Sequence, residues 1–301
     1  MATLLTAENK EYVPSSWESV PCPFCAYDRH KPHERFGPQN RYAYVKCRRC
    51  GLVYAHRRPK YEASFVETAY EVYDVESHHV STGGALSQAN QSIVAHNKIT
   101  LRQMERHLGR KGKLLDIGCA SGLFLYAAKE EGWCPTGIDV SEKMTRHCRD
   151  AFGVPTYLGQ YHTLDLSEGG PFDVIYCSHV IEHILNPNEW MEKFRADLKA
   201  DGLLCLNVPN QYSADRVLKR CLKRAGLKRE NWARWRTPDH LYEPHARPML
   251  YLMQKHAFQT LEFFTYSHNE NETPTQIDRL MHLRLKWGSK LRFFAAPNAH
   301  S

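Results

Sequence analysis

Two groups of residues in this 301-residue chain have the types and the spacing needed for chemistry. The first group is four cysteines in two C-x-x-C pairs, Cys22 with Cys25 and Cys47 with Cys50, and 21 residues separate the pairs. Two such pairs bring four thiolates around one cation, a pattern typical of zinc ribbons. Because protein ligands would fill all four positions, we expect a structural zinc within a ribbon over about residues 15–60.

The second group is a short run of ionisable side chains after an apolar stretch that predicts a buried strand. The run is SHVIEH at residues 178–183, and His240 lies further along the chain. An imidazole titrates near neutral pH, so His179 or His183 is a candidate general base, and Glu182 could orient either ring. One other role stays open at this point: the side chains could serve only in capping and packing.

A turn of small residues predicts that a ligand lies against the backbone. Residues 113–117 form an apolar run of buried-strand type, and the sequence GCASG follows at 118–122. A second apolar strand ends at Asp139, 23 residues after Asp116, where a carboxylate can accept hydrogen bonds from both hydroxyls of a ribose. The third glycine of the dinucleotide pattern is missing, so S-adenosylmethionine, which has an amino-acid tail and no phosphate, fits the turn better than a pyrophosphate does.

Strand and helix patterns alternate from residue 113 onward. Such alternation predicts an α/β fold, with a Rossmann-like seven-stranded and mostly parallel sheet and helices on both faces. We expect strands at about residues 113–117, 134–139, 154–157, 172–177, 202–208, 259–266 and 290–296. In an open sheet of this kind, ligands bind at the carboxyl ends of the strands, so the turn, Asp139 and the histidines should share one site.

The motifs resemble those of a known enzyme class. DIGCASG and GIDVS are similar to motif I and the acidic second-strand end of class I S-adenosylmethionine-dependent methyltransferases. FDVIYCSHVIEH, LKADGLL, VPN and DHLYE resemble the landmarks of the ubiquinone-biosynthesis O-methyltransferases. The ribbon, with CRRCGLVY, is similar to the zinc-binding region ahead of many bacterial methyltransferases that act on sugars and secondary metabolites. The resemblance implies that the cofactor contacts Asp116, Gly118, Cys119, Gly122, Asp139, Ser178 and Gln160.

The resemblance also bears on the histidine segment. Related O-methyltransferases bind a divalent ion through an E-x-x-E-H segment and a later histidine, which implies catalytic roles for His179, Glu182, His183 and His240. In this chain His179 stands in place of the first glutamate of that segment, which removes one hard oxygen ligand. A metal that prefers nitrogen ligands would therefore suit the site better than magnesium.

The order of these patterns along the sequence divides the chain into a zinc ribbon at 15–60, a helical connector at 61–110 and a domain at 111–301 that resembles the class I methyltransferases. The domain contains a basic helical insertion at about 211–238. Its basic residues, which precede Trp232 and Trp235, include Arg216, Lys219, Arg220, Lys223, Arg224, Lys228 and Arg229. Four interpretations of this insertion stay open: a solvated helix face, a lid over an anionic acceptor, a contact with an acidic membrane surface or, as a minor option, a contact with nucleic acid.

We expect O-methylation of a small molecule or of a glycan or nucleotide-sugar component, with an anionic acceptor. One alternative is C-methylation of a nucleotide-linked deoxysugar, and another is a zinc-ribbon nucleic-acid-binding protein with a degenerate methyltransferase domain. The modest net charge of +7 disfavours nucleic acid. No apolar run approaches the roughly 20 residues that span a bilayer, and residues 1–13 lack a cationic start and a long apolar stretch, so we expect a cytoplasmic location. The sequence does not indicate an oligomeric state.

Overall fold

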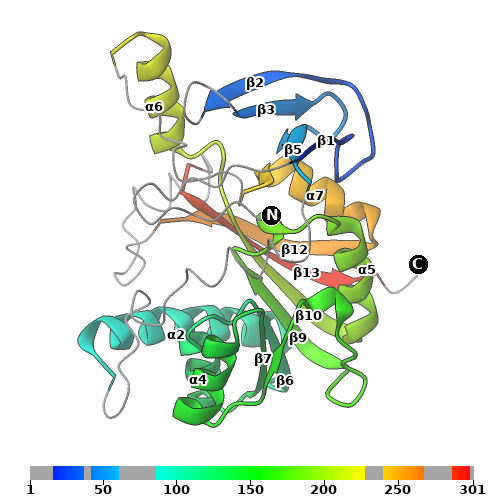
Figure 1. The fold of residues 1–301 in the computed structure, drawn as a ribbon. Helices are drawn as coiled ribbons and strands as arrows, with labels where there is room; N and C mark the ends of the chain where they lie inside the picture. Colours follow the sequence, from blue (N-terminus) through cyan, green and yellow to red (C-terminus); the bar gives the residue numbers. More distant parts are fainter. Residues whose placement is uncertain (1–15, 37–41, 61–85, 228–239, 268–286, 299–301) are drawn as a thin grey trace.

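A computed structural model of the protein describes residues 16–36, 42–60, 86–227, 240–267 and 287–298, to which every structural statement below refers (Figure 1). Its centre is a seven-stranded sheet with the order β12-β13-β10-β9-β6-β7-β8. All neighbouring pairs from β10 to β8 are parallel, whereas β13 is antiparallel to both β10 and β12. The strands are β6 (Lys113–Ile117), β7 (Cys134–Asp139), β8 (Thr156–Leu158), β9 (Phe172–Ser178), β10 (Leu198–Pro209), β12 (Phe258–Tyr266) and β13 (Lys290–Pro297). The predicted mostly parallel, Rossmann-like sheet is confirmed.

Helices cover both faces of this sheet because side chains alternate along each strand. Leu115 and Ile175 pack on one face against α5 and α7, and Leu114 and Val174 pack on the other face against α2 and α3. α4 packs beside β7, where Cys148 joins a small separate apolar cluster. The helices are α2 (Gln88–Leu108), α3 (Leu123–Glu130), α4 (Glu142–Phe152), α5 (Pro187–Asp197), α6 (Ala214–Arg224) and α7 (Ala246–Lys255).

Capping residues fix the ends of the helices that border the ligand turns. The hydroxyl of Ser141 accepts a hydrogen bond from the backbone N–H of Met144 at the start of α4, and Gly153 ends the helix in the left-handed conformation. Ser141 lies only two residues after Asp139. The cap therefore also holds the short connection that carries this carboxylate.

The N-terminal strands form a smaller module at the edge of the molecule, drawn in blue in Figure 1. Within it, β1 (Trp17–Ser19) pairs with β5 (Arg57–Pro59). A second sheet has the order β11-β4-β3-β2, in which β2 is His30–Phe36, β3 is Tyr42–Cys47 and β4 is Val53–Ala55. The fourth strand of this sheet, β11 (Tyr242–Glu243), comes from the distant carboxyl-terminal part of the chain and is antiparallel to β4.

This module and the central sheet share one apolar core. Phe24, Leu52 and Tyr54 of the module belong to the same buried cluster as Tyr242 and Met249, which also contains the α5 and α7 face of the central sheet. The rings of Phe24 and Tyr242 meet edge to face with their centroids 5.6 Å apart. The module is therefore packed against the sheet through a continuous hydrophobic interior.

Two strands begin more than one residue away from the expected position. β8 begins at Thr156 instead of residue 154, because Pro155 has no backbone N–H to donate to a neighbouring strand. β10 begins already at Leu198, directly after α5, and its pairing with β9 shifts register between Leu198 and Leu203.

Part of the predicted connector and insertion lies outside the described residues. α2 accounts for the second half of the connector and α6 for the first part of the insertion, while the segments 61–85 and 228–239, with Trp232 and Trp235, are not described. Among the described helices, none is long and apolar enough to cross a membrane.

Candidate active site

A cavity of about 540 Å³ lies at the carboxyl ends of the central strands. Gly118 follows β6, Asp139 ends β7 and Ser178 ends β9, and all three residues line the cavity. Because β6 lies between β7 and β9 in the sheet, the cavity extends across three neighbouring strand ends. This is the place where open α/β sheets bind their ligands.

The turn after β6 depends on residues without bulky side chains. Gly118 and Gly122 have φ values of 74° and 77°, in the left-handed region that glycine adopts without strain. A Cβ atom at Gly118 would lie 2.5 Å from Val180 Cγ2, and one at Gly122 would lie 2.5 Å from Cys148 Sγ. Other residues at these two positions would push the turn away from its neighbours.

Backbone hydrogen bonds hold the Asp139 carboxylate at the rim of this turn. Its Oδ2 atom accepts from the N–H of Ala120 at 2.8 Å, and its Oδ1 atom accepts from the N–H of Ser141 at 2.9 Å. The carboxylate therefore connects the turn after β6 to the end of β7, and its direction is fixed before any ligand binds.

The seven residues proposed for the cofactor occupy two kinds of position. Gly118, Asp139, Gln160 and Ser178 line the cavity, whereas Asp116, Cys119 and Gly122 do not. Asp116 is 3% exposed, and burial, together with the nearby charge of Asp139, raises the pKa of its carboxyl well above the usual value. Cys119 belongs to the apolar cluster of Cys148, and Gly122 packs closely against Cys148. Both residues therefore support the turn on the side that does not face the cavity.

An aromatic wall of the cavity was missed by reasoning from the sequence. Tyr161, His162 and Trp190 line the cavity, and the rings of Tyr161 and Trp190 lie 5.1 Å apart. The Tyr161 hydroxyl donates to Asp197 Oδ2 at 2.8 Å, which orients the ring. Tyr161 and His162 directly follow Gln160, and that adjacency was an available signal. Trp190 lies on α5, and only the folded arrangement brings it to this cavity.

The histidine segment forms the opposite side of the cavity. His179 has a φ of 57°, an uncommon conformation for a residue other than glycine, and its N–H donates to Asn207 O at 3.0 Å. This turn brings His179 Nδ1 to 3.3 Å from Glu182 Oε1. Glu182 is 1% exposed, and its burial would raise its pKa, but the hydrogen bond with His179 and the charges of the nearby imidazoles outweigh burial and hold the pKa at about 2.

Glu182, His183 and His240 lie together although the two histidines are 57 positions apart in the sequence. One ligand atom from each of the three side chains lies within 4.8 Å of the others. The rings of His183 and His240 are nearly perpendicular, with their centroids 4.7 Å apart. His179 does not belong to this group of three, but it contacts Glu182, which does. Three of the four residues predicted for catalysis therefore form one group, and the fourth is linked to it by a hydrogen bond.

The N-terminal module holds His240 in this position. The Tyr44 hydroxyl on β3 donates to the carbonyl oxygen of His240 at 2.9 Å. The next residue, Leu241, donates its N–H to Glu182 O at 2.8 Å and accepts at its carbonyl from the N–H of Ala55 at 3.0 Å. His240 is thus fixed between the module and the histidine segment.

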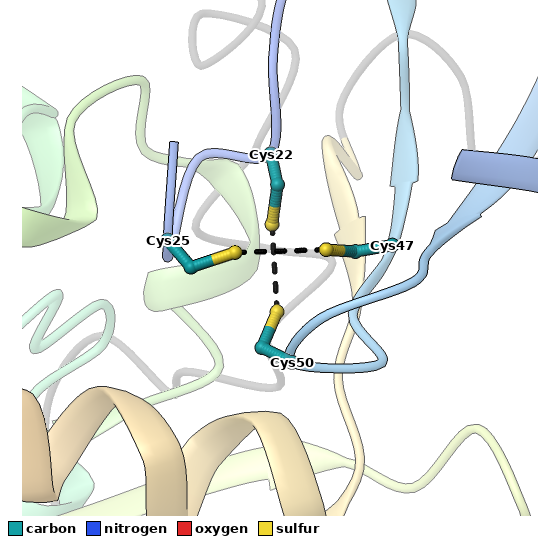
Figure 2. A group of neighbouring side chains, drawn as sticks. All are labelled: Cys22, Cys25, Cys47 and Cys50. Atoms are coloured by element: carbon teal, nitrogen blue, oxygen red, sulfur yellow. Dashed lines mark hydrogen bonds between the residues drawn. The ribbon is translucent and has the colours of Figure 1, made fainter. Parts of the chain in front are cut away.

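The four cysteines of the module form a closed, buried group. Figure 2 shows their thiols pointing toward a common centre, with Cys22 Sγ 3.5 Å from Cys50 Sγ and Cys25 Sγ 3.5 Å from Cys47 Sγ. Tetrahedral zinc with bonds of about 2.3 Å would place its sulfurs ~3.8 Å apart, so the thiols fit such an ion with little adjustment. The hydrogen bond with Cys22 lowers the pKa of Cys50 to about 6, whereas the same bond and burial raise the pKa of Cys22 well above its usual value.

The Rossmann-like sheet, the glycine turn with Asp139 and the cavity at the strand ends define a class I S-adenosylmethionine-dependent methyltransferase. The family model described as a methyltransferase domain matches residues 91–262, more than half of the chain. The chain belongs to this methyltransferase family.

Two similar relatives are both named ubiquinone biosynthesis O-methyltransferase. The relative from Caulobacter vibrioides is 34% identical over 141 residues, which cover 45% of this chain and 54% of the relative. The relative from Coxiella burnetii is 28% identical over 120 residues, which cover 38% of this chain and 51% of the relative. The chain thus spans about half the length of the curated relatives it matches.

Among solved structures, the magnesium protoporphyrin IX methyltransferase of Synechocystis, with bound SAH, is similar in fold. Its TM-score is 0.52 at 15% sequence identity, and the match covers 79% of this chain and all of that one. At this identity the likeness shows the fold alone.

Proposed function

We propose that the protein transfers the methyl group of S-adenosylmethionine to a hydroxyl group of a small-molecule acceptor. The observation that carries this proposal is that one cavity contacts both the glycine turn with Asp139 and the pair His183 and His240. Its volume of about 540 Å³ lies in the range of about 300–1,000 Å³ that is typical of ligand pockets. The relatives named O-methyltransferases favour a hydroxyl as the acceptor.

Asp139 is the residue proposed to hold the ribose. A carboxylate has about four lone-pair sites, and two of them accept the backbone N–H groups of Ala120 and Ser141. Asp139 also lines the cavity at the end of β7, where a carboxylate can accept hydrogen bonds from the hydroxyls of a ribose. Gln160, which lies on the cavity wall after β8, is proposed to contact the adenine.

The catalytic work of the protein's own side chains is proposed to be positioning and proton removal. S-adenosylmethionine supplies a methyl group that is already activated by its sulfonium, and alignment of the acceptor lowers the barrier further. His183 and His240 line the cavity and are proposed to contact the acceptor hydroxyl, with one ring taking its proton. The buried, ionised Glu182 stabilises the positive charge that this ring then carries, and His179 is a positioning residue that holds Glu182.

A divalent metal at Glu182, His183 and His240 is the alternative way to activate the hydroxyl. The group fits an ion because its ligand atoms converge within 4.8 Å and because Glu182 Oε2 is buried with no hydrogen-bond partner among the described residues. Two imidazoles and one carboxylate suit metals that prefer nitrogen. If dialysis against a chelator leaves the cysteine-bound metal in place and turnover does not change, the base mechanism stands and the metal is excluded.

We also propose that Cys22, Cys25, Cys47 and Cys50 bind zinc in a structural role. Their burial and closed geometry leave no position for a substrate. The ion would stabilise the module that carries Tyr44 and pairs with β11.

Calorimetric titration with S-adenosylhomocysteine tests the proposed cofactor site. We expect saturable binding to the wild type and a dissociation constant at least tenfold larger for Asp139→Ala, because about two hydrogen bonds to a charged group are lost. Glu142→Ala, in the first turn of α4 and exposed, is a matched control that should bind like the wild type. No binding by the wild type would refute the proposed function.

A transfer experiment with S-adenosylmethionine labelled by ¹³C in its methyl group identifies the methylated atom. A panel of phenols and nucleotide sugars serves as acceptors, and NMR separates an O-methyl carbon from a C-methyl carbon. O-methyl products support the proposal, whereas C-methyl products establish the alternative of C-methylation.

A further inference from the structure

Tyr212 is surrounded by basic side chains that come from three separate segments. Lys46 Nζ donates to the Tyr212 hydroxyl at 2.7 Å and lies 5.0 Å from the ring centroid. The Arg220 guanidinium of α6 lies 5.8 Å from the same centroid, and the His245 ring meets it edge-on at 4.6 Å. Lys46, Arg220, His245 and Arg247 are named the basic cluster below.

The basic cluster has fewer carboxylates than cations. Glu34 lies 4.0 Å from Arg220, and Glu243 pairs with Arg216 on the same helix. Within the described parts of the chain, no carboxylate lies within 4.0 Å of the charged groups of Lys46 or Arg247. Lys46, His245 and Arg247 nevertheless converge, because a Cβ atom at Gly51 would lie 3.7–3.8 Å from all three side chains.

The buried His245 ring lies next to several of these cations, and both its burial and their charges lower its pKa. It is 8% exposed, and its Nδ1 atom is buried with no hydrogen-bond partner among the described residues. Burial, and then the charges of Lys46, His33 and Arg247, lower the pKa of its imidazole to about 3. Cations held this close repel each other unless an anion lies between them.

The basic cluster is linked to His240 through Glu243, whose Oε1 atom lies 3.9 Å from His240 Nδ1 and whose Oε2 atom pairs with Arg216 of α6. Tyr212 comes three residues after the carboxyl end of β10, and Gln211 donates its N–H to Pro244 O beside β11. Side chains two residues apart on a strand share a face, so Lys46 lies on the same face of β3 as Tyr44, which bonds to His240, and opposite to Cys47.

We propose that Lys46, Arg220 and Tyr212 bind an anionic group, phosphate or carboxylate, of the methyl acceptor whose reacting hydroxyl lies beside His183 and His240. The proposal rests on the proposed methyltransferase function and adds the charge class of the acceptor. Arg247 strengthens the positive field at the same place. Ion-pair and hydrogen-bond contacts from a lysine, an arginine and a tyrosine are the usual means of holding such oxygens.

Calorimetric titration with inorganic diphosphate and, separately, with malonate tests the basic cluster in the full-length, zinc-containing protein loaded with S-adenosylhomocysteine. We expect saturable binding of at least one anion by the wild type, at least tenfold weaker binding by Lys46→Met, and affinity within about threefold of the wild type for Lys46→Arg. The anion that binds more tightly identifies a phosphoryl or a carboxylate acceptor. Lys219→Met is the matched control, because Lys219 bonds to Asp215 on the outer part of α6 and should leave the affinity unchanged.

Two results would overturn the proposal. One is the absence of saturable anion binding by the wild type, and the other is an equal affinity of the wild type and Lys46→Met, provided that zinc content and thermal unfolding show both to be folded. If Lys46→Met does not fold, Tyr212→Phe takes its place, and we expect its anion affinity to be about threefold weaker than that of the wild type. An affinity equal to that of the wild type would again overturn the proposal. If the wild type binds S-adenosylhomocysteine but neither anion, only this inference is refuted. If the wild type binds neither S-adenosylhomocysteine nor an anion, the proposed function is refuted as well.

Discussion

Two groups of side chains in this protein have the types and spacing to hold a metal ion, and they differ in what surrounds them. The four thiols of Cys22, Cys25, Cys47 and Cys50 are all buried in the apolar core, whereas His183 and His240 are half-buried and line the cavity with Glu182. In both groups the ligand atoms lie within 4.8 Å of one another. A closed set can only stabilise the fold, while an open set can also contact a substrate. The surroundings, more than the residue types, distinguish the two roles.

A short strand connects the two groups. β11 pairs with β4 of the cysteine module, and His240 comes two residues before it. The Tyr44 hydroxyl and the Ala55 N–H of the module hold the backbone of residues 240 and 241. The closed group therefore supports the open one, and three substitutions test this relation.

Loss of the closed group should have the largest effect. Cys47→Ser removes one of four thiolates, and because a structural site depends on its complete ligand set, we expect loss of zinc, a large drop in thermal stability and at least a hundredfold loss of turnover. Elemental analysis, thermal unfolding and turnover measure these effects. Cys134→Ser, at an exposed cysteine, is the control. Normal zinc content and turnover in Cys47→Ser would contradict the structural role.

Removal of the open group's distant member should separate function from stability. His240→Ala deletes a side chain that is not part of the apolar core, so we expect turnover to fall by about 10²–10⁴-fold, the usual contribution of a positioned acid or base. Zinc content and S-adenosylhomocysteine affinity should stay those of the wild type. An unchanged turnover would show that alignment of the acceptor alone drives the reaction.

The smallest effect should come from the connection itself. Tyr44→Phe removes the hydroxyl that donates to His240 O, and a hydrogen bond of this kind is worth about 1 kcal/mol. We expect a several-fold loss of turnover, with zinc retained and the unfolding free energy reduced by a similar amount. The equivalent change Tyr157→Phe, at an exposed tyrosine of β8, should have no effect on either quantity. If Tyr44→Phe turns over as fast as the wild type, the cysteine group does not support the histidine group through this hydrogen bond.

The sequence predicted the parts of this arrangement that depend on local pattern. The strands that end at Ile117, Asp139 and Ser178, and the C-x-x-C pairs, have short-range signals in period, spacing and turn residues. The alternation of side chains along β6 agrees with Ile117 lining the cavity while the buried Asp116 does not.

The remaining features depend on contacts between distant segments. β11 is only two residues long and forms because β4 lies beside it. A segment this short has no hydrophobic pattern from which a strand could be predicted. Trp190 reaches the cavity through the packing of α5 on the sheet, and the basic cluster around Tyr212 combines β3, α6 and the start of α7. Each of these residues could be identified in the sequence, but the contacts between them could not be predicted from it.

NMR of the histidine rings in the wild type, with and without zinc, tests the support of the open group by the closed group most directly. With ¹³C-labelled histidine, we expect the His240 signal to shift or broaden when zinc is removed, because β11 loses its partner strand. His107, which packs on Phe294 on the opposite side of the central sheet, is the internal reference and should keep its signal. A His240 signal that does not change while the zinc is gone would contradict the account.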